Sequence, residues 1–158
     1  MNSGFEARVH SFLYEWEMYQ HGADPNGFSF LQRMEHLKAA KKLVQKFWLF
    51  GCGIGDLKSE FDSYYTETNS LLLPENRLRA HNQFLTAWIA TGVIGLICTM
   101  LFFIMPLIQM RWNYFSIICL ISIFISFLSE DMLETQAGAT IFALFYSLGV
   151  FNEREQAR

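Results

Sequence analysis

The stretch that decides the fold is residues 83–110, "QFLTAWIATGVIGLICTMLFFIMPLIQM", which contains no charged residue. A transmembrane helix needs about 20 apolar residues, and as few as about 17 can suffice. Two further apolar runs follow at 112–128 and 136–151, and both are near the short end of that range. We therefore predict an all-α integral membrane protein with about three transmembrane helices. For the last run, a buried helix of a protein core is the alternative.

The charged residues divide the chain near residue 82. Of the 12 Lys and Arg residues, nine precede His81 and three follow it: Arg111, Arg154 and Arg158. We expect residues 1–81 to form a water-exposed helical region, followed by the membrane region. The net charge of -3 provides no basic field, so a nucleic acid is not an expected partner.

The region before residue 82 has the pattern of three helices. Apolar residues recur at helical spacing over residues 4–20 and again over residues 29–50. The sequence "GCGIGD" at 51–56 then ends the second helix. Because no strand precedes these glycines and no Gly-Lys-Ser/Thr follows them, we interpret them as a tight turn, not a phosphate-binding loop. A short third helix is expected over residues 57–65.

The cysteines and histidines show neither a metal-binding nor a disulfide pattern. Cys52, Cys98 and Cys119 are widely spaced and form no CxxC pair, and the four histidines show no HxxxH or HExxH spacing. We therefore expect no metal site and no cofactor.

The loops between the apolar runs predict an orientation, because short cytoplasmic loops are enriched in Lys and Arg. The three arginines after His81 lie in the first loop and in the C-terminal tail, whereas the second loop, "SEDMLETQ" (129–136), has three acids and no base. This puts the C-terminus in the cytoplasm and the acidic loop outside, together with residues 1–81. Loops longer than about 60 residues escape the rule, so the lysines of residues 1–81 do not contradict it. His81 then lies at the outer membrane–water boundary.

A spaced motif begins at that boundary. In "HNQFLTAWIATGVIG", nine residues separate His81-Asn82 from Gly92, and two more separate Gly92 from Gly95. Upstream, Arg33 lies near the start of the helix that runs to the glycine turn. With its acidic second loop as well, the chain resembles, from about residue 29 onward, the O-antigen ligase and polymerase superfamily of bacterial envelope glycosyltransferases.

The resemblance implies metal-independent transfer of a glycan from undecaprenyl pyrophosphate to lipid A-core, a step of lipopolysaccharide biosynthesis at the periplasmic face of the bacterial inner membrane. It implies that residues 1–81 are periplasmic. It also implies that the chain is the C-terminal part of a larger protein, or works with an upstream polypeptide that supplies further spans, and is inactive alone. An O-antigen or exopolysaccharide polymerase, a protein O-oligosaccharyltransferase and a non-catalytic membrane scaffold are the alternatives. Leu96, where ligases often carry threonine, is a departure from the ligase pattern.

The resemblance also suggests roles for individual residues. His81 is the expected catalytic residue, because an imidazole can take the proton of an acceptor hydroxyl. Arg33 is expected to bind the pyrophosphate, a group that guanidinium holds through two donors. Arg77 and Arg79 are substrate-binding candidates by their position beside His81. Asn82 either orients the imidazole or, as we favour, caps the helix.

Two further expectations concern the glycines and the acids. Gly92 and Gly95 are expected to let helices pack closely in the membrane. The acids of the second loop, Glu130, Asp131 and Glu134, most simply solvate it, and one of them could orient His81.

Overall fold

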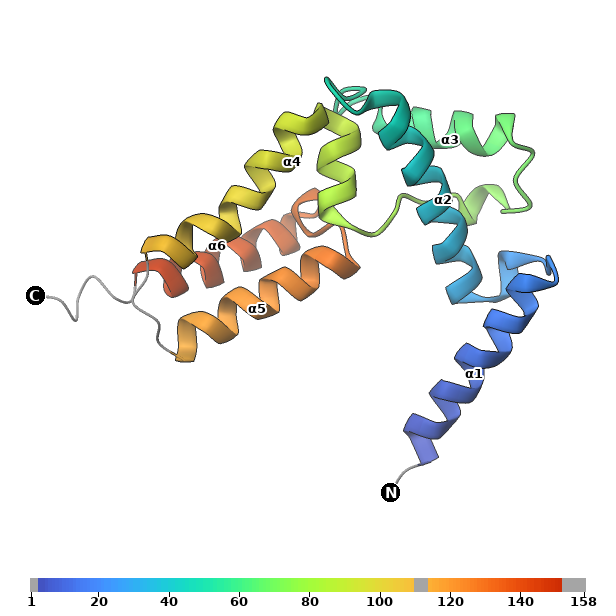
Figure 1. Cartoon of the computed structure of the whole chain (residues 1–158), viewed down its shortest axis with the longest axis horizontal. Coiled ribbons are helices and arrows are strands. Elements are labelled where there is room, and N and C mark those ends of the chain that lie inside the picture. Colours follow the sequence, from blue (N-terminus) through green and yellow to red (C-terminus); the bar gives the residue numbers. More distant parts are fainter. Residues whose placement is uncertain (1–2, 110–113, 152–158) are drawn as a thin grey trace, which may run out of the picture.

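The computed structural model describes residues 3–109 and 114–151, and within them it is helical without strands (Figure 1). The helices are α1 (Ser3–Gln20), α2 (Ser29–Phe47), α3 (Leu57–Glu67), α4 (Gln83–Gln109), α5 (Tyr114–Ser129) and α6 (Gln136–Phe151). Short 3-10 turns are η1 (Pro25–Gly27), η2 (Pro74–Asn76) and η3 (Met132–Glu134). The all-α prediction is confirmed for these residues. The three arginines that predicted the orientation (Arg111, Arg154, Arg158) lie outside them, as do the edges of the first two predicted spans.

Helix α4 is broken at Gly92, so the first predicted span is not one straight helix. Gly92 has φ 71° and ψ -161°, which no helical residue adopts. The break divides α4 into a first segment, residues 83–91, and a second segment, residues 93–109, and the chain bends sharply between them (Figure 1).

The break is held against the end of α2 by two glycines, Gly51 and Gly92, which we call the glycine joint. A Cβ atom on Gly92 would overlap the backbone of Leu49, and one on Gly51 would overlap the backbone of Ala90. Beside them, the Gly53 N–H donates to the Ala90 carbonyl at 2.8 Å. The two backbones therefore approach as closely as they do because neither glycine has a side chain.

The expectation that Gly92 and Gly95 let membrane helices pack against one another is wrong. Gly92 contacts the chain just after α2, outside the three apolar helices. The nearest neighbours of a Cβ on Gly95 would be Thr91 and Ala87, from the first segment of α4 itself.

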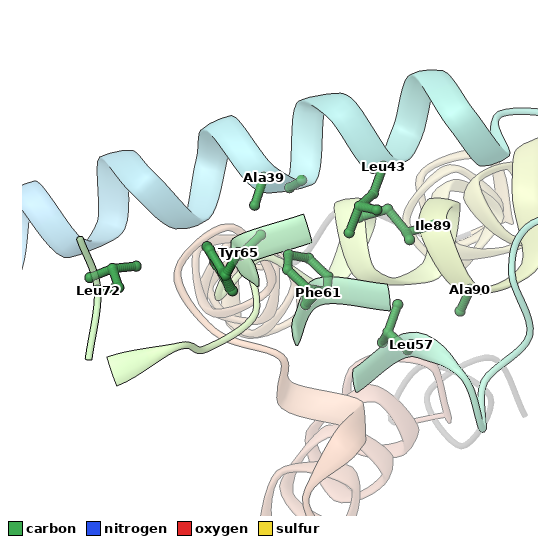
Figure 2. Packing of buried hydrophobic residues seen from close by; sticks show 10 residues of the cluster. Ala39, Leu43, Leu57, Phe61, Tyr65, Leu72, Ile89 and Ala90 are labelled. Atoms are coloured by element: carbon green, nitrogen blue, oxygen red, sulfur yellow. The ribbon is translucent and has the colours of Figure 1, made fainter. Parts of the chain in front are cut away.

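A first hydrophobic core joins α2, α3 and the first segment of α4 (Figure 2). Its buried residues are Ala39, Ala40, Leu43, Leu57, Phe61, Tyr65, Leu72, Ala80, Ile89 and Ala90. The core thus continues past His81, where the sequence predicts the end of the water-exposed region, and into α4. The division into regions 1–81 and 82–158 stays a prediction.

A second core, rich in aromatic residues, holds α4, α5 and α6 together as neighbouring helices that alternate in direction (Figure 1). Its buried members are Phe84, Phe103, Ile123 and Phe127. The rings of Phe103 and Phe127 meet edge to face, with centroids 5.3 Å apart. Such aromatic pairs add about 0.5–1.5 kcal/mol beyond the area they bury.

The outer face of these three helices is apolar and open. More than half exposed are Ile94, Ile97, Ile108, Tyr114, Ile118, Ile121, Ile125 and Leu144. Counted across the break and judged by length and composition alone, residues Gln83–Met105 could cross a membrane, and 28% of their apolar window is buried, whereas the core helix of a soluble protein is mostly buried. The apolar parts of α5 and α6 are shorter. The outer face has the composition of a lipid-facing surface.

Candidate functional site

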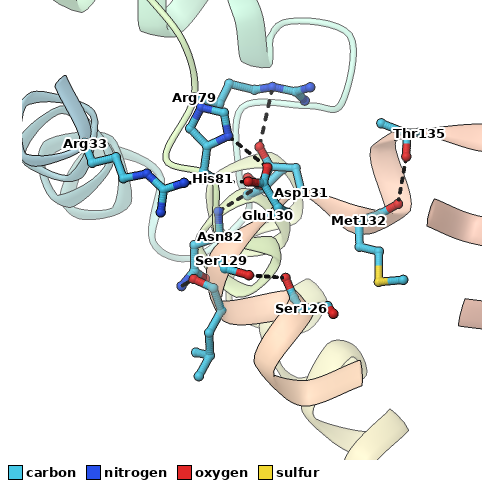
Figure 3. A network of polar contacts seen from close by, with 12 residues as sticks. Arg33, Arg79, His81, Asn82, Ser126, Ser129, Glu130, Asp131, Met132 and Thr135 are labelled. Carbon is cyan, nitrogen blue, oxygen red and sulfur yellow. Dashed lines mark hydrogen bonds and ion pairs between the residues drawn. The ribbon is translucent and has the colours of Figure 1, made fainter. Parts of the chain in front are cut away.

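A cluster of polar side chains lies where α2, the start of α4 and the loop after α5 meet (Figure 3). It contains Arg33, His36, Arg79, His81, Asn82, Glu130, Asp131 and Glu134. Residues about 50 positions apart in the sequence are thus brought together at one end of the three apolar helices.

His81 is held by Glu130. Its Nδ1 lies 3.2 Å from Glu130 Oε2, and because a carboxylate can only accept, the imidazole donates this hydrogen bond. The other ring nitrogen, Nε2, then carries a lone pair in the neutral ring. The backbone at His81 has φ 49°, which is uncommon for a residue other than glycine. The structure therefore pairs His81 with one of the three acids considered for orienting it.

Arg33 reaches the same carboxylate from α2. Its Nη2 lies 3.7 Å from Glu130 Oε1, and both side chains are more than half exposed, at 57% and 58%. An exposed ion pair of this kind contributes at most about 1 kcal/mol. An anionic ligand can therefore displace Glu130 from Arg33 at little cost.

Arg79 is bound more firmly than Arg33. Its Nη1 donates to Glu134 Oε2 at 2.9 Å, and its Nε lies 3.9 Å from Asp131 Oδ2. Asp131, just before η3, and Glu134, its last residue, thus share one guanidinium group. Arg79 ties the acidic loop to the segment that precedes His81.

Asn82 caps α4, as favoured from the sequence. Its Oδ1 accepts from the N–H groups of Phe84 and Leu85, both at 3.1 Å, which satisfies donors of the first helical turn. Its own N–H donates to Asp131 Oδ1 at 3.1 Å, and Thr86 Oγ1 donates to the same oxygen at 2.6 Å. The residue after His81 is therefore anchored both to its helix and to the acidic loop.

His36 is a member of the cluster that the sequence reasoning missed. It is 2% exposed, its Nε2 lies 2.9 Å from the Asn76 carbonyl oxygen, and its ring centroid is 5.7 Å from that of His81. Burial lowers the pKa of His36, against the opposing effect of the hydrogen bond to Asn76. The available signal was its position three residues after Arg33, which puts both side chains on neighbouring parts of α2.

The proton of neutral His36 can be assigned from its partner. A carbonyl oxygen only accepts, so Nε2 is the protonated nitrogen and Nδ1 carries the lone pair. Nδ1 is buried and has no hydrogen-bond partner within the described part of the chain.

Arg77 is not brought into the cluster. Its Nε donates to the Leu72 carbonyl at 3.1 Å, and its Nη1 lies 3.3 Å from Thr66 Oγ1. These contacts hold the segment after α3 in place. Although Arg77 and Arg79 are two residues apart, their side chains serve different neighbours.

The formal charges of the cluster do not balance. Three carboxylates (Glu130, Asp131, Glu134) face two guanidinium groups (Arg33, Arg79). Across residues 3–109 and 114–151, no group of three or more His, Cys, Asp or Glu side chains is arranged to hold a metal ion. As it stands, the cluster offers an imidazole base and one displaceable arginine.

Comparison with known families places this cluster in context. A family model described as O-antigen ligase matches residues 7–100, more than half of the chain. The matched range contains Arg33, the glycine joint and the motif from His81 to Gly95. No curated protein and no solved structure matches the chain.

Proposed function

Because the chain belongs to the O-antigen ligase family, we propose that it takes part in transferring a glycan from undecaprenyl pyrophosphate to a hydroxyl group of lipid A-core. The observation that carries this proposal is the His81–Glu130 pair beside Arg33. It combines a base for the acceptor with a cation for the leaving group, at the end of three apolar helices where a lipid carrier would present its pyrophosphate.

In the proposed reaction, His81 Nε2 takes the proton of the acceptor hydroxyl. The hydroxyl oxygen then forms a bond to the anomeric carbon of the glycan, and the bond from that carbon to the pyrophosphate oxygen breaks. The electron pair leaves with the pyrophosphate, and Glu130 stabilises the imidazolium that forms. A positioned base of this kind contributes about 10²–10⁴-fold to a rate.

We assign the growing negative charge of the leaving group to Arg33. Its guanidinium presents several N–H donors and is always charged, and its contact with Glu130 is exposed and long. Arg79 and Asn82, in contrast, are assigned to positioning, because their donors already hold the acidic loop.

The excess of carboxylates bears on how a pyrophosphate would bind. An anionic substrate near Glu130, Asp131 and Glu134 needs more positive charge than Arg33 and Arg79 supply. We therefore propose that a further cation comes from a part of the site outside this chain, in agreement with the upstream spans expected from the resemblance.

We place the cluster at the periplasmic face of the bacterial inner membrane, with the C-terminus in the cytoplasm. Support comes from the contact between His81 and the acidic loop, which are at the same end of α4 to α6. The sequence-based orientation assigns both to the outer side.

A polymerase that transfers the glycan to a second lipid-linked glycan is the alternative, favoured by Leu96. The product separates the two reactions, since a ligase attaches the glycan to core and a polymerase lengthens the chain before attachment.

The test is a set of chromosomal substitutions in the source cells, read as lipopolysaccharide banding on gels and as membrane abundance of the protein. His81→Ala and Arg33→Ala should abolish transfer with normal abundance. Arg77→Ala is the matched control, because this arginine is near His81 in sequence but outside the cluster, and it should retain transfer. Unchanged transfer by His81→Ala would refute the proposal and support the scaffold alternative.

A further inference from the structure

The turn after α2 exposes a group of large apolar side chains, which we call the apolar turn (residues 48–54). Phe50 is 80% exposed, Ile54 69% and Trp48 55%, and Leu49 is also exposed. This segment contains Gly51 and Gly53, both with positive φ, so it is a tight turn as predicted, but its neighbouring side chains are unlike those of a water-facing turn. None of them belongs to the polar cluster.

The apolar turn lies beside the point where the second segment of α4 begins (Figure 1). The Val93 N–H donates to the Trp48 carbonyl at 3.0 Å, and the indole N–H of Trp88 donates to the same oxygen at 3.0 Å. Just beyond, Ile94 and Ile97 are exposed on the apolar outer face. The apolar turn therefore continues the outer face of α4 to α6 past the break.

Backbone N–H groups of the apolar turn are hydrogen-bonded within the protein, so they do not need water as an acceptor. The N–H groups of Gly51, Cys52 and Gly53 donate to the carbonyls of Phe47, Ile89 and Ala90 at 3.0, 2.9 and 2.8 Å. An irregular segment next to lipid is costly mainly because of unsatisfied backbone groups. Here the end of α2 supplies one acceptor and the broken helix α4 supplies the other two, so that cost is reduced.

The length of the second segment of α4 shows where the apolar turn would lie relative to a bilayer. At about 1.5 Å per residue, residues 93–109 span roughly 26 Å, which is close to the thickness of about 30 Å of the hydrocarbon core of a bilayer. The first segment bends away, so it does not add to this length (Figure 1). The apolar turn lies at the end of this segment that begins with Val93, whose N–H donates to the Trp48 carbonyl, and next to the exposed Ile94 and Ile97.

We propose that the apolar turn inserts Trp48, Phe50 and Ile54 into the outer boundary of the lipid bilayer, between the headgroups and the acyl chains. Tryptophan and other large apolar side chains are favoured at that depth. In this arrangement the glycine joint fixes how deep the second segment of α4 lies. The inference rests on the membrane placement in the proposed function, but not on glycan transfer.

The test uses the whole chain in nanodiscs of phosphatidylethanolamine and phosphatidylglycerol, with its three cysteines replaced by alanine. A nitroxide label is placed through Ile54→Cys, Ile97→Cys or Lys58→Cys, all at exposed positions. Collisions with oxygen report lipid and collisions with a water-soluble nickel complex report water. We expect oxygen to dominate at 54 and 97, and nickel to dominate at Lys58, the matched control on α3.

Each other outcome overturns the inference. If the label at 54 behaves like that at 58, the turn is in water, and if it is shielded from both reagents, protein covers it. If 97 also reports water, the membrane placement fails as well, so the two failures are distinguishable.

A second measurement keeps the cysteines and leaves Trp48 as the sole tryptophan through Trp16→Phe, Trp88→Phe and Trp112→Phe. Quenching of Trp48 by lipids brominated on the upper acyl chain should be strong. The matched variant that keeps only Trp16, on α1, should be quenched by acrylamide instead. Equal behaviour of the two would refute the insertion.

Discussion

Gly92→Ala should destabilise the protein strongly, because two independent costs coincide at this position. With φ 71° and ψ -161°, Gly92 is in backbone space that is almost closed to other residues, at a cost on the order of 1–3 kcal/mol. The new methyl group would also overlap the backbone of Leu49, and overpacking against a rigid neighbour adds about 1–3 kcal/mol. The expected loss is therefore roughly 2–6 kcal/mol.

This loss can be measured as a change in thermal midpoint. For a chain of about this size, 1 kcal/mol corresponds to about 2–4 °C, so the Tm should fall by roughly 5–20 °C. The assay is far-ultraviolet circular dichroism of the purified chain in detergent micelles. Gly55→Ala is the matched control: it is in the loop after α2 that contains Gly51, its φ is not positive, and a Cβ there meets no atom within 4 Å.

The partner glycine provides a second check on the same reasoning. Gly51→Ala should destabilise by a similar amount, because a Cβ there overlaps the Ala90 backbone at φ 76°. The stability losses of two substitutions in one contact do not add, so the Gly51→Ala/Gly92→Ala double variant should lose less stability than the sum of the two single losses. A Gly92→Ala variant with the Tm of Gly55→Ala would refute the idea that the joint holds the break.

Three further predictions concern the polar cluster. The free energy of unfolding should fall as the pH drops below the ordinary histidine pKa of 6.5, because burial keeps His36 neutral in the folded chain while the unfolded chain takes up the proton. This loss continues until the pH reaches the lowered pKa of folded His36. In urea unfolding, the free energy of unfolding of His36→Gln should depend less on pH over that window. Glu130→Gln should lower transfer on the order of 10-fold and alter its pH profile, whereas equal transfer at every pH would contradict an orienting role. Arg79→Lys keeps the charge but loses the guanidinium group that contacts both Glu134 and Asp131, so the free energy of unfolding measured with a denaturant should fall by about 1 kcal/mol. An unchanged free energy of unfolding would mean that the ion pairs are not formed in solution.

Local pattern was enough to locate the helices. The last predicted run, 136–151, has the bounds of α6, and the stripe at 4–20 corresponds to α1 (Ser3–Gln20). These elements follow from the spacing of apolar side chains along one stretch of chain. His81 and Arg33, in contrast, are named as site residues from the resemblance to a family, and their roles stay predictions.

The break in α4 could not be predicted in this way. A glycine within an apolar run is compatible with an unbroken helix, a kink or a close packing contact. Which of these occurs depends on the backbone of Leu49, more than 40 residues earlier, and no local preference contains that information. The continuous span expected over 83–110 therefore became two segments with different neighbours.

What the sequence alone determined is the helical class, the apolar runs and the family motif from His81 to Gly95, since each depends on residues near one another in the chain. Only the tertiary structure decided that Glu130 holds His81, that buried His36 lies beside it, and that Arg77 faces away while Arg79 clamps the acidic loop. The physical reason is the separation along the chain between each side chain and the group that it contacts. The side chains of Arg79 and His81 find their partners in the loop after α5, about 50 residues later in the chain, which no local pattern contains.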